Sequence, residues 1–278
     1  MTRACVIGWP IAHSRSPLIH NHWLRQYGID GSYTREPVKP EDLQTFLQSL
    51  KALGLAGCNV TVPHKETAFA LAAVRDPSAV AVNAANTLWL DDGRLACANT
   101  DTYGFMANLD AAAPDWQKRA GPVLILGAGG SARAVVYGFL EAGIGEVRVF
   151  NRTLDRAQDL VRHFGARVSA HAWDDRNEHV PEAAVIVNTT TLGMNGTGTV
   201  GIDFTRAQSG AVAADLVYVP LETEFLQSAR ANGLIGVDGL GMLLHQAVPG
   251  FEKWFGVRPV VTSELYQIIA RDIGGAKC

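Results

Sequence analysis

The chain has 278 residues, of which 47% are hydrophobic and 18% are charged, and its formal net charge is -3 at pH 7. This composition is typical of a folded globular protein and excludes a disordered chain. The small net charge leaves no basic footprint, which argues against nucleic acid or an acidic membrane surface as a partner. The length allows two domains, each with its own core.

The apolar segments of the sequence are short. The N-terminal run "ACVIGWPIA" is broken at Gly8 and Pro10 and lacks the length of a secretory core. No apolar stretch approaches the roughly 20 residues that a membrane helix needs. The cysteines are scattered with no C-x-x-C pair, which predicts neither a disulfide framework nor a zinc site. We therefore expect a cytoplasmic protein with no membrane partner and no metal. The cysteines are Cys5, Cys58, Cys97 and Cys278.

The first hundred residues alternate between strand-like and helix-like segments. "ACVIG" is a predicted strand, and "SPLIHNHWLRQYG" a helix with Ser16 as N-cap, Pro17 at the first position and Gly28 as the stop. The strand "GSYTREPV", the helix "PEDLQTFLQSLKALG", the strand "AGCNVTV" and a helix from about His64 follow. Residues 86–100 form a predicted hairpin around an Asp-Gly turn. The pattern predicts a mainly parallel sheet to which the hairpin adds antiparallel edge strands.

The second half of the chain begins a new series of strands and helices. Residues 110–121 have no clear period, and "PVLILGAGGSARAVVYGFLEAG" then starts a second strand-loop-helix unit. Later predicted strands are "EVRVFN", "AAVIVN", "GAVAADLVY" and "LIGVDG", and the chain ends in the helix-like stretches "GMLLHQAVPGFEKWFG" and "TSELYQIIARDIG". We therefore predict a domain boundary near residue 110.

A glycine-rich loop follows the strand "PVLIL" and fits the pattern G-x-G-x-x-A. Gly127 permits a tight turn, Gly129 lets the backbone approach a pyrophosphate, and small Ala132 allows close packing of helix on strand. Anions are favoured there because helix N–H groups point outward. The loop predicts a Rossmann-type dinucleotide site, although a plain glycine turn is the alternative. Its residues are Gly127, Ala128, Gly129, Gly130 and Ser131.

The end of the next strand bears on the choice of dinucleotide. An NAD site usually places an acidic residue there for the ribose hydroxyls, whereas this chain has Asn151, Arg152 and Thr153, with Arg156 one turn later. A carboxylate would repel a 2′-phosphate, and a guanidinium can bind it in a bidentate fork. NADP is therefore favoured over NAD; the alternative is that both arginines are solvated charges at a helix start.

Two further groups of polar residues lie in the first half. Ser14 and Ser16 occupy a strand-to-helix turn, where hydroxyls and free N–H groups can hold a carboxylate, or where Ser16 merely caps the helix. Three further segments carry polar side chains that could come together at the carboxyl ends of sheet strands, the edge where open α/β sheets bind ligands. An aspartate beside a lysine stabilises the ammonium form, and burial opposes it. Separately, each of these residues is more typical of a surface charge or a cap. They are Asn59, Thr61, Lys65, Asn86, Asn99, Thr100 and Asp101.

Taken together, these segments resemble the shikimate dehydrogenase family over nearly the full length of the chain. Each motif alone is weak, but nine occur in family order. They are "HSRSP" (13–17), "NVTVPHK" (59–65), "NTL" (86–88), "NTD" (99–101), "GAGGSAR" (127–133), "NRTLDRA" (151–157), "NTTTLGM" (188–194), "DLVYVPLET" (215–223) and "GLGMLLHQA" (239–247).

The resemblance implies an α/β fold of two domains. The first is an N-terminal substrate domain with a mainly parallel sheet, residues 1–110, which C-terminal helices of residues 240–278 return to complete. The second is a Rossmann-type NADP-binding domain, residues 111–239. The implied activity is a reversible, NADP(H)-linked hydride transfer between shikimate and 3-dehydroshikimate, a step of aromatic amino-acid precursor synthesis.

The resemblance also implies roles for individual residues. Ser14 and Ser16 would hold the substrate carboxylate, and Lys65 would be the acid-base residue with Asp101 as its partner. As hydride reaches the carbonyl carbon, an ammonium at the oxygen would stabilise the growing charge and deliver a proton. The remaining substrate residues would be Asn59, Thr61, Asn86, Tyr218 and Gln246. The cofactor residues would be 127–131, Asn151, Arg152, Thr153 and Arg156, with Leu216 and Gly239 near the nicotinamide.

Two departures and two alternatives accompany this interpretation. Asn83 stands where the family commonly has glycine, which puts the loop before Asn86 in doubt, and Thr189 stands where alanine is usual. One alternative is a quinate/shikimate dehydrogenase with relaxed substrate or NAD use, and another is a non-catalytic NADP-binding regulatory protein. The sequence leaves the oligomeric state open, a homodimer included.

Overall fold

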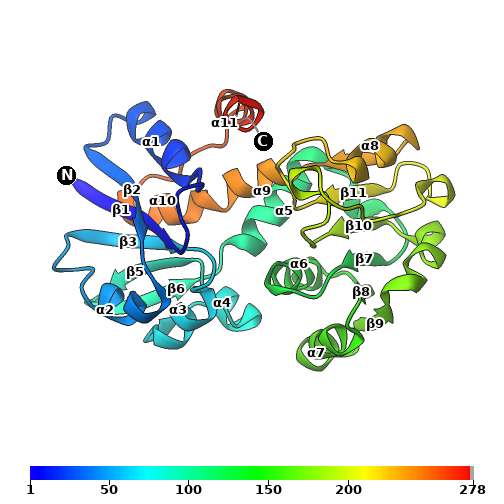
Figure 1. The fold of residues 1–278 in the computed structure, drawn as a ribbon, viewed down its shortest axis with the longest axis horizontal. Helices are drawn as coiled ribbons and strands as arrows, with labels where there is room; N and C mark the ends of the chain where they lie inside the picture. The colour runs from blue at the N-terminus through cyan, green and yellow to red at the C-terminus, as the bar shows by residue number, and fades with distance from the viewer. Residues whose placement is uncertain (276–278) are drawn as a thin grey trace. The chain divides into compact units, whose positions relative to one another are not determined.

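The computed structural model describes residues 1–275, which form two compact units (Figure 1). Unit 1 comprises Met1–Thr102 and Leu244–Ile269, and unit 2 comprises Tyr103–Leu243 together with the chain from Ala270. The boundary predicted near residue 110 lies inside one helix, α5 (Asp101–Ala112), and the structure divides the chain at the start of that helix. The chain therefore leaves unit 1 and returns to it.

Unit 1 is built on a six-stranded sheet with the order β2-β1-β3-β5-β6-β4. Only β5 is antiparallel to its neighbours, because β6 turns back and lies parallel to β3. The predicted hairpin is therefore correct, but its strands do not form the edge of the sheet. The edge strand is β4, which pairs with β6 and which the sequence did not predict. The strands are β1 (Thr2–Gly8), β2 (Gly31–Pro37), β3 (Leu55–Val60), β4 (Val74–Arg75), β5 (Thr87–Asp91) and β6 (Arg94–Ala98).

The helices of unit 1 follow the predicted segments with two corrections. Arg15 is the N-cap of α1 and no side chain caps it, so Ser16 is the first helical residue and not a cap. The stretch predicted as one helix from 241 to 256 is broken at Gln246, because Pro249 tolerates only the first turn of a new helix. The helices are α1 (Ser16–Gln26), α2 (Leu43–Gln48), α3 (Lys65–Leu71), α4 (Pro77–Val82) and α10 (Ala247–Phe255). Two more helices cross the division: α9 (Gly239–His245) begins in unit 2, and α11 (Ser263–Gly275) begins in unit 1.

The two faces of this sheet bury different clusters because side chains alternate along each strand. From β1, Cys5 and Ile7 pack into the cluster that contains Leu43 and Leu47 of α2. The intervening residues Ala4 and Val6 face the other way, toward α10. Figure 1 shows α1 and α10 on that face and α2 and α3 on the opposite one. Residues of β3 alternate in the same way, which decides where Asn59 points.

Helix α10 is locked onto the sheet at one close contact. The indole nitrogen of Trp254 donates a hydrogen bond of 2.9 Å to the carbonyl oxygen of Leu88 in β5. Gly57 of β3 lies directly beneath, and a Cβ there would stand 2.1 Å from the same oxygen and 2.3 Å from the indole nitrogen. Only glycine leaves room for this approach. Helix α10 is therefore an integral layer of unit 1.

Unit 2 contains a second six-stranded sheet, entirely parallel, with the order β12-β11-β10-β7-β8-β9. If the six strands are numbered in chain order from β7, their order across the sheet is 3-2-1-4-5-6, which is the Rossmann arrangement. The strand order, and not the strand direction, reverses between β7 and β10. The sequence predicted every strand except β9. The strands are β7 (Val123–Leu126), β8 (Val147–Asn151), β9 (Val168–Ala172), β10 (Val185–Asn188), β11 (Val212–Asp215) and β12 (Ile235–Val237).

Helices cover both faces of this second sheet. Phe139 of α6 and Phe105 of α5 pack with Val123 and Ile125 of β7 in one cluster. Leu124 of the same strand faces a second cluster that includes side chains of α8. The helices are α6 (Gly130–Glu141), α7 (Leu154–Phe164) and α8 (Glu224–Ala231), and the short 3-10 segments of the chain are residues 40–42, 116–118, 173–178, 180–182, 194–196 and 204–206.

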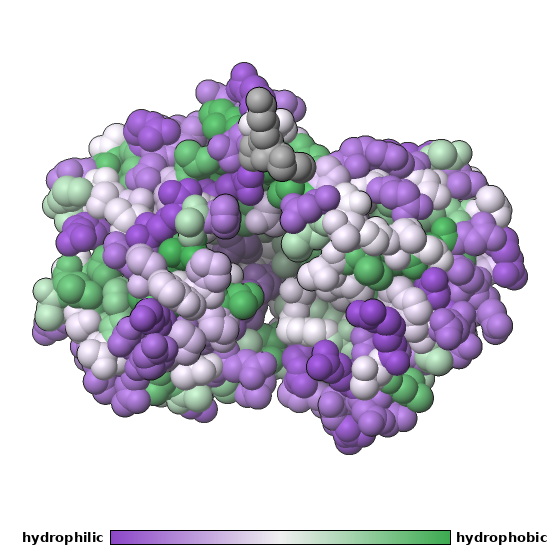
Figure 2. Space-filling model, viewed as in Figure 1, coloured by the Kyte–Doolittle hydropathy of each residue, from purple (hydrophilic) through white to green (hydrophobic). Residues whose placement is uncertain are grey.

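The surface mixes polar and apolar residues. Figure 2 shows hydrophilic residues spread over this face with hydrophobic ones scattered among them. Within residues 1–275, no helix has both the length and the apolar character needed to cross a bilayer. The cysteines Cys5, Cys58 and Cys97 are free and buried, and Cys278 lies outside the described residues.

His20 of α1 is buried in an aromatic cluster on the α10 face of unit 1. Its ring is fully buried, stacks on Tyr33 at a centroid distance of 4.0 Å, and also contacts Trp23, Phe251 and Trp254. Neither ring nitrogen has a hydrogen-bond partner within the described residues. Burial lowers the pKa of His20 to about 3 from its ordinary value of 6.5. The imidazole is therefore neutral in the folded protein at neutral pH.

We expect His20 to make folding sensitive to acid. Because the folded-state pKa is the lower one, the unfolded chain binds the extra proton, so this contribution to stability is complete above pH 6.5 and is lost as pH falls toward 3. It amounts to about 3 kcal/mol between pH 7 and pH 4.5. His20→Phe should abolish that part of the loss when urea unfolding is measured at both pH values.

The matched control for this experiment is His22→Phe, which changes a half-buried histidine of the same helix. It should keep the acid sensitivity of the unsubstituted protein. Equal losses of unfolding free energy in the His20→Phe protein and the unsubstituted protein would contradict the assignment.

Candidate active site

The sheet register of unit 1 brings the polar motifs together. Asn59 of β3 pairs with Thr87 of β5, and Thr87 pairs with Ala98 of β6. Because β5 is antiparallel, its beginning lies at the edge where β3 and β6 end. The segments "NVTV", "NTL" and "NTD" therefore meet at one edge of the sheet, as the sequence predicts.

Lys65 and Asp101 form an ion pair at this edge. The Lys65 ammonium lies 2.5 Å from Oδ2 of Asp101, and the two side chains are 31% and 13% exposed. Lys65 is the first residue of α3 and Asp101 the first of α5, where the positive end of the helix dipole favours a carboxylate. The partly exposed lysine is held in place and can still reach a ligand.

Asn86 holds the other oxygen of Asp101. Its Nδ2 donates 2.8 Å to Oδ1 of Asp101 and lies 3.5 Å from Oε1 of Gln246. Its Oδ1 accepts from the backbone N–H of Thr100 at 2.8 Å, which fixes the orientation of the amide. The Thr100 hydroxyl donates to the backbone oxygen of Gln246. Residues from four parts of the chain, at positions 65, 86, 100–101 and 246, thus meet at this edge.

Asn59 and Thr61 have different surroundings. Asn59 is 5% exposed, and its side chain bonds to Tyr33, Thr87 and the backbone oxygen of Asn86. Thr61 is half-buried just beyond β3, and its backbone N–H donates to Ile7. Asn59 therefore lies beneath the edge as a support, whereas Thr61 lies on it.

The serine turn follows β1 at the carboxyl edge of the same sheet. The hydroxyl of Ser14 lies 3.3 Å from that of Ser16 and accepts from the Ser16 backbone N–H at 3.4 Å. Arg35 donates to the backbone oxygen of Ser14 at 2.8 Å, which holds the turn. Both hydroxyls lie at the start of α1, where the helix dipole favours an anion.

The glycine loop of unit 2 joins β7 to α6 at the point where the strand order reverses. Gly127 has a φ of +105°, and a Cβ there would stand 2.8 Å from the hydroxyl of Thr189. Added Cβ atoms at Gly129 and Gly130 would meet nothing within 4 Å, so the start of α6 is open to a ligand. Ala132 is fully buried. Gly127 and Ala132 therefore have the conformation and the packing that were predicted for them.

The end of β8 carries cations and amides and no acidic residue. Arg152 and Arg156 are exposed, and Asn151 donates from its side chain to the backbone oxygen of Thr153 at 2.7 Å. One carboxylate, Asp155, lies in the first turn of α7. The two exposed guanidinium groups fit a phosphate better than a ribose hydroxyl pair.

Asp215 anchors the loop after β11. The sequence did not predict this role. Its carboxylate is 1% exposed and accepts from the Asn188 amide at 2.8 Å, the Thr223 hydroxyl at 2.7 Å and the backbone N–H of Val217 at 3.0 Å. Burial raises the pKa of Asp215, and these three hydrogen bonds oppose the rise. A buried aspartate with bound partners is not visible in sequence spacing.

The anchored loop carries Leu216, predicted to lie near the nicotinamide, and Tyr218, predicted to bind the substrate. Leu216 donates its backbone N–H to Asn188 at 3.0 Å, and Tyr218 is half-buried two residues later. A Cβ on Gly239 would stand 2.4 Å from the backbone oxygen of Leu216, so the two backbones touch. Leu216, Tyr218 and Gly239 therefore form one local group at the end of β11.

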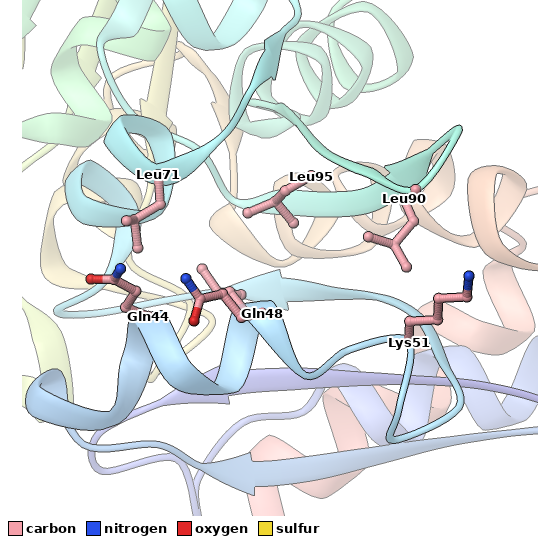
Figure 3. A pocket seen from close by; sticks show the side chains of 8 residues that line it. Gln44, Gln48, Lys51, Leu71, Leu90 and Leu95 are labelled. Atoms are coloured by element: carbon pink, nitrogen blue, oxygen red, sulfur yellow. The ribbon is translucent and has the colours of Figure 1, made fainter.

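A pocket of about 360 Å³ lies elsewhere in unit 1 and contains none of these residues. Figure 3 shows Leu71, Leu90 and Leu95 on one side of it and the α2 residues Gln44 and Gln48 on the other. Its polar rim is exposed, including Lys51. Within the described part of the chain, no group of three His, Cys, Asp or Glu side chains is placed to hold a metal ion.

Comparison with known proteins identifies the family. The model for the shikimate dehydrogenase substrate binding domain matches residues 6–88, that for shikimate / quinate 5-dehydrogenase residues 112–194, and that for the shikimate 5'-dehydrogenase C-terminal domain residues 239–261. The chain is 58% identical to the shikimate dehydrogenase (NADP(+)) of Brucella canis over 99% of its own length and 96% of that protein. The chain belongs to the shikimate dehydrogenase family. The corresponding protein of Azorhizobium caulinodans is 52% identical, with 98% and 97% covered.

Solved structures of this shikimate dehydrogenase family share the fold. The Thermus thermophilus enzyme, in complex with NADP(H) and shikimate, is 36% identical with a TM-score of 0.84, and 98% of this chain and 100% of that chain are covered. The quinate dehydrogenase of Corynebacterium glutamicum, in complex with NAD, is 29% identical with a TM-score of 0.89, and 97% and 99% are covered. The fold alone therefore does not separate shikimate from quinate or NADP from NAD.

The departure from the family pattern at Asn83 is explained by the structure. Asn83 ends α4 with a φ of +56°, in the left-handed region that glycine prefers and asparagine tolerates. The loop then returns to Ala85, whose backbone N–H donates to the Lys65 carbonyl at 2.9 Å. The substitution keeps the loop conformation next to Asn86.

Proposed function

We propose that the protein catalyses the NADP-dependent, reversible reduction of 3-dehydroshikimate to shikimate, with Lys65 and Asp101 as its acid-base pair. The observation that carries the proposal is the ion pair of these residues at the strand edge, held by Asn86 on one side and partly exposed on the other. A protein that only binds nucleotide has no need of a proton-transfer pair.

The residues around the pair suit a small polyhydroxylated acid. Ser14 and Ser16 offer hydroxyls and helix N–H groups to a carboxylate. Thr61, Asn86 and Gln246 offer donors and acceptors to hydroxyl groups. We assign the substrate carboxylate to the serine turn and its ring hydroxyls to the strand edge. Tyr218 of unit 2 is assigned to the same substrate.

The residues of unit 2 fit NADP(H). The open start of α6 at Gly129 and Gly130 would hold the pyrophosphate, and Arg152 with Arg156 the 2′-phosphate. Leu216 and Gly239 would lie against the nicotinamide. When bound, NADPH supplies the hydride that reduces the carbonyl carbon.

Lys65 then acts on the carbonyl oxygen. Its ammonium stabilises the negative charge that grows there and donates the proton that completes the hydroxyl group. In the reverse direction the neutral amine accepts that proton. Asp101 holds the amine in position through the 2.5 Å contact, and Asn86 holds Asp101.

Quinate oxidation with NAD is the second candidate, favoured by the structural similarity to a quinate dehydrogenase. The absence of an acidic residue at 151–153 argues against it. A cytoplasmic location is proposed on the three free thiols of the described chain, and a homodimer stays a prediction.

The test is a set of initial rates with shikimate and with quinate, each against NADP and NAD. We expect the highest kcat/KM for shikimate with NADP. Folded protein that reduces no NADP in the presence of shikimate would refute the proposed function. Faster turnover of quinate with NAD would support the second candidate instead.

A further inference from the structure

Tyr33 lies in β2, on the face of the sheet that α10 covers. Its side chain is 2% exposed and is sandwiched in the aromatic cluster, with His20 stacked on its ring and Trp254 5.9 Å away. The backbone of Tyr33 is fixed as well, because Asn21 of α1 bonds to both its N–H and its carbonyl. The position of its hydroxyl is therefore set by packing from every side.

The hydroxyl of Tyr33 donates a hydrogen bond of 2.6 Å to Oδ1 of Asn59. Burial raises the pKa of Tyr33 well above 10, so the phenol keeps its proton and remains a donor at any working pH. This hydrogen bond joins β2 to β3.

The side-chain amide of Asn59 connects the Tyr33 hydroxyl to residues 86 and 87 at the strand edge. Its Nδ2 donates to the backbone oxygen of Asn86 at 3.1 Å and to the Thr87 hydroxyl at 3.2 Å. Both amide protons are used, and the carbonyl of Asn86 can only accept, so Oδ1 must face Tyr33. The amide has a single orientation, and it holds residue 86 from below.

The hydrogen bonds continue from there to the lysine and aspartate. Thr87 donates to Oδ1 of Asn86 at 3.0 Å, and Nδ2 of Asn86 donates to Asp101. Without the Tyr33 hydroxyl, Oδ1 of Asn59 would be a buried acceptor with no partner. An unpaired acceptor costs far more free energy when it is buried than when it is exposed to water. The amide would then be free to turn away from Asn86.

We propose that Tyr33 is a positioning residue of the substrate site, which fixes residue 86 through the side-chain amide of Asn59. Tyr33 itself touches neither Lys65 nor Asp101 in the hydrogen bonds described. The inference rests on the proposed function and goes beyond it, because it assigns substrate affinity to a residue beneath the site.

The experiment compares steady-state kinetics of Tyr33→Phe with those of the unsubstituted protein. We expect KM for shikimate to rise by about tenfold, the range for one unpaired buried acceptor, and kcat to fall by less than about fivefold. KM for NADP should stay within twofold. A loss of stability alone would lower the active fraction and hence the apparent kcat, and would leave KM unchanged.

Two further variants complete the test. Tyr27→Phe is the matched control, because it removes a hydroxyl that accepts only from the backbone N–H of Val260 at the surface; its kinetics should be unchanged. Thr87→Val removes the next hydroxyl in the series, beyond Asn59, and should raise KM for shikimate in the same way. It decides the question if Tyr33→Phe does not fold.

The outcomes are separable. If the unsubstituted protein does not turn over shikimate, the proposed function fails and the role of Tyr33 falls with it. If it does, and KM for shikimate in Tyr33→Phe stays within twofold, only the role of Tyr33 is overturned. An equal rise in KM for shikimate and for NADP would also overturn it, as would an unchanged KM in Thr87→Val.

Discussion

Replacing Lys65 by alanine is expected to lower kcat by about 100-fold or more while KM for shikimate changes much less. The ammonium is needed where negative charge develops on the carbonyl oxygen, and that charge exists only in the transition state. Its ion pair with Asp101 keeps it in place, and its partial exposure leaves it accessible. Initial rates of NADP reduction over a range of shikimate concentrations measure both constants.

Lys51→Ala is the control for this experiment. Lys51 is an exposed lysine of the same unit on the rim of the separate leucine-lined pocket, and it is not part of the strand edge. Its loss should leave kcat within twofold. If Lys51→Ala lowers kcat as strongly as Lys65→Ala, the special role of Lys65 is wrong.

The second large effect is expected at Arg152. Arg152→Ala should lower kcat/KM for NADP by about 10-fold to 100-fold, the range for a lost charge-assisted hydrogen bond, and leave kcat/KM for NAD nearly unchanged. The reason is that the exposed guanidinium at the end of β8 is proposed to bind the 2′-phosphate, and NAD lacks that group. Rates with each cofactor at saturating shikimate give the ratio.

Arg162→Ala supplies the comparison for that experiment. Arg162 lies on the same helix, α7, and pairs with Asp159 at the surface. Because it is far along the helix from the end of β8, its removal should not change the preference for NADP. A parallel loss of kcat/KM with NADP and NAD in Arg152→Ala would show that the arginine supports the loop and does not read the phosphate.

The family and the fold class were predictable from the sequence, and both are confirmed. The glycine loop was legible because its residue types are dictated locally, by a positive φ at Gly127 and close packing at Ala132. The strand edge was predictable for a different reason. Parallel strands end at one edge of a sheet, and the antiparallel β5 begins at that edge, so the polar residues of all three segments lie there.

The sequence could not predict the features that depend on residues far apart in the chain. The two-residue strand β4 exists only because β6 offers it a partner, and β9 is half-exposed and lacks an apolar run. The N-cap role expected of Ser16 failed because its hydroxyl bonds to Ser14 instead of the helix. We expected Asn59 to lie at the site itself, but a hydrogen bond from Tyr33 holds it beneath the strand edge. The two residues are 26 positions apart in the sequence.

The discontinuity of unit 1 has a consequence for biosynthesis. A ribosome makes the six strands of its sheet first, but the layer carrying Trp254 and Phe251 is translated only near the end. Until then the part of the sheet that α10 covers is exposed, and Gln246 cannot accept the hydrogen bond from Thr100. Unit 2, encoded mostly as a continuous block, is free to fold earlier. A nascent chain can therefore fold unit 2 before the strand edge of unit 1 is complete, and chains truncated before residue 246 should lack the hydrogen bond from Thr100.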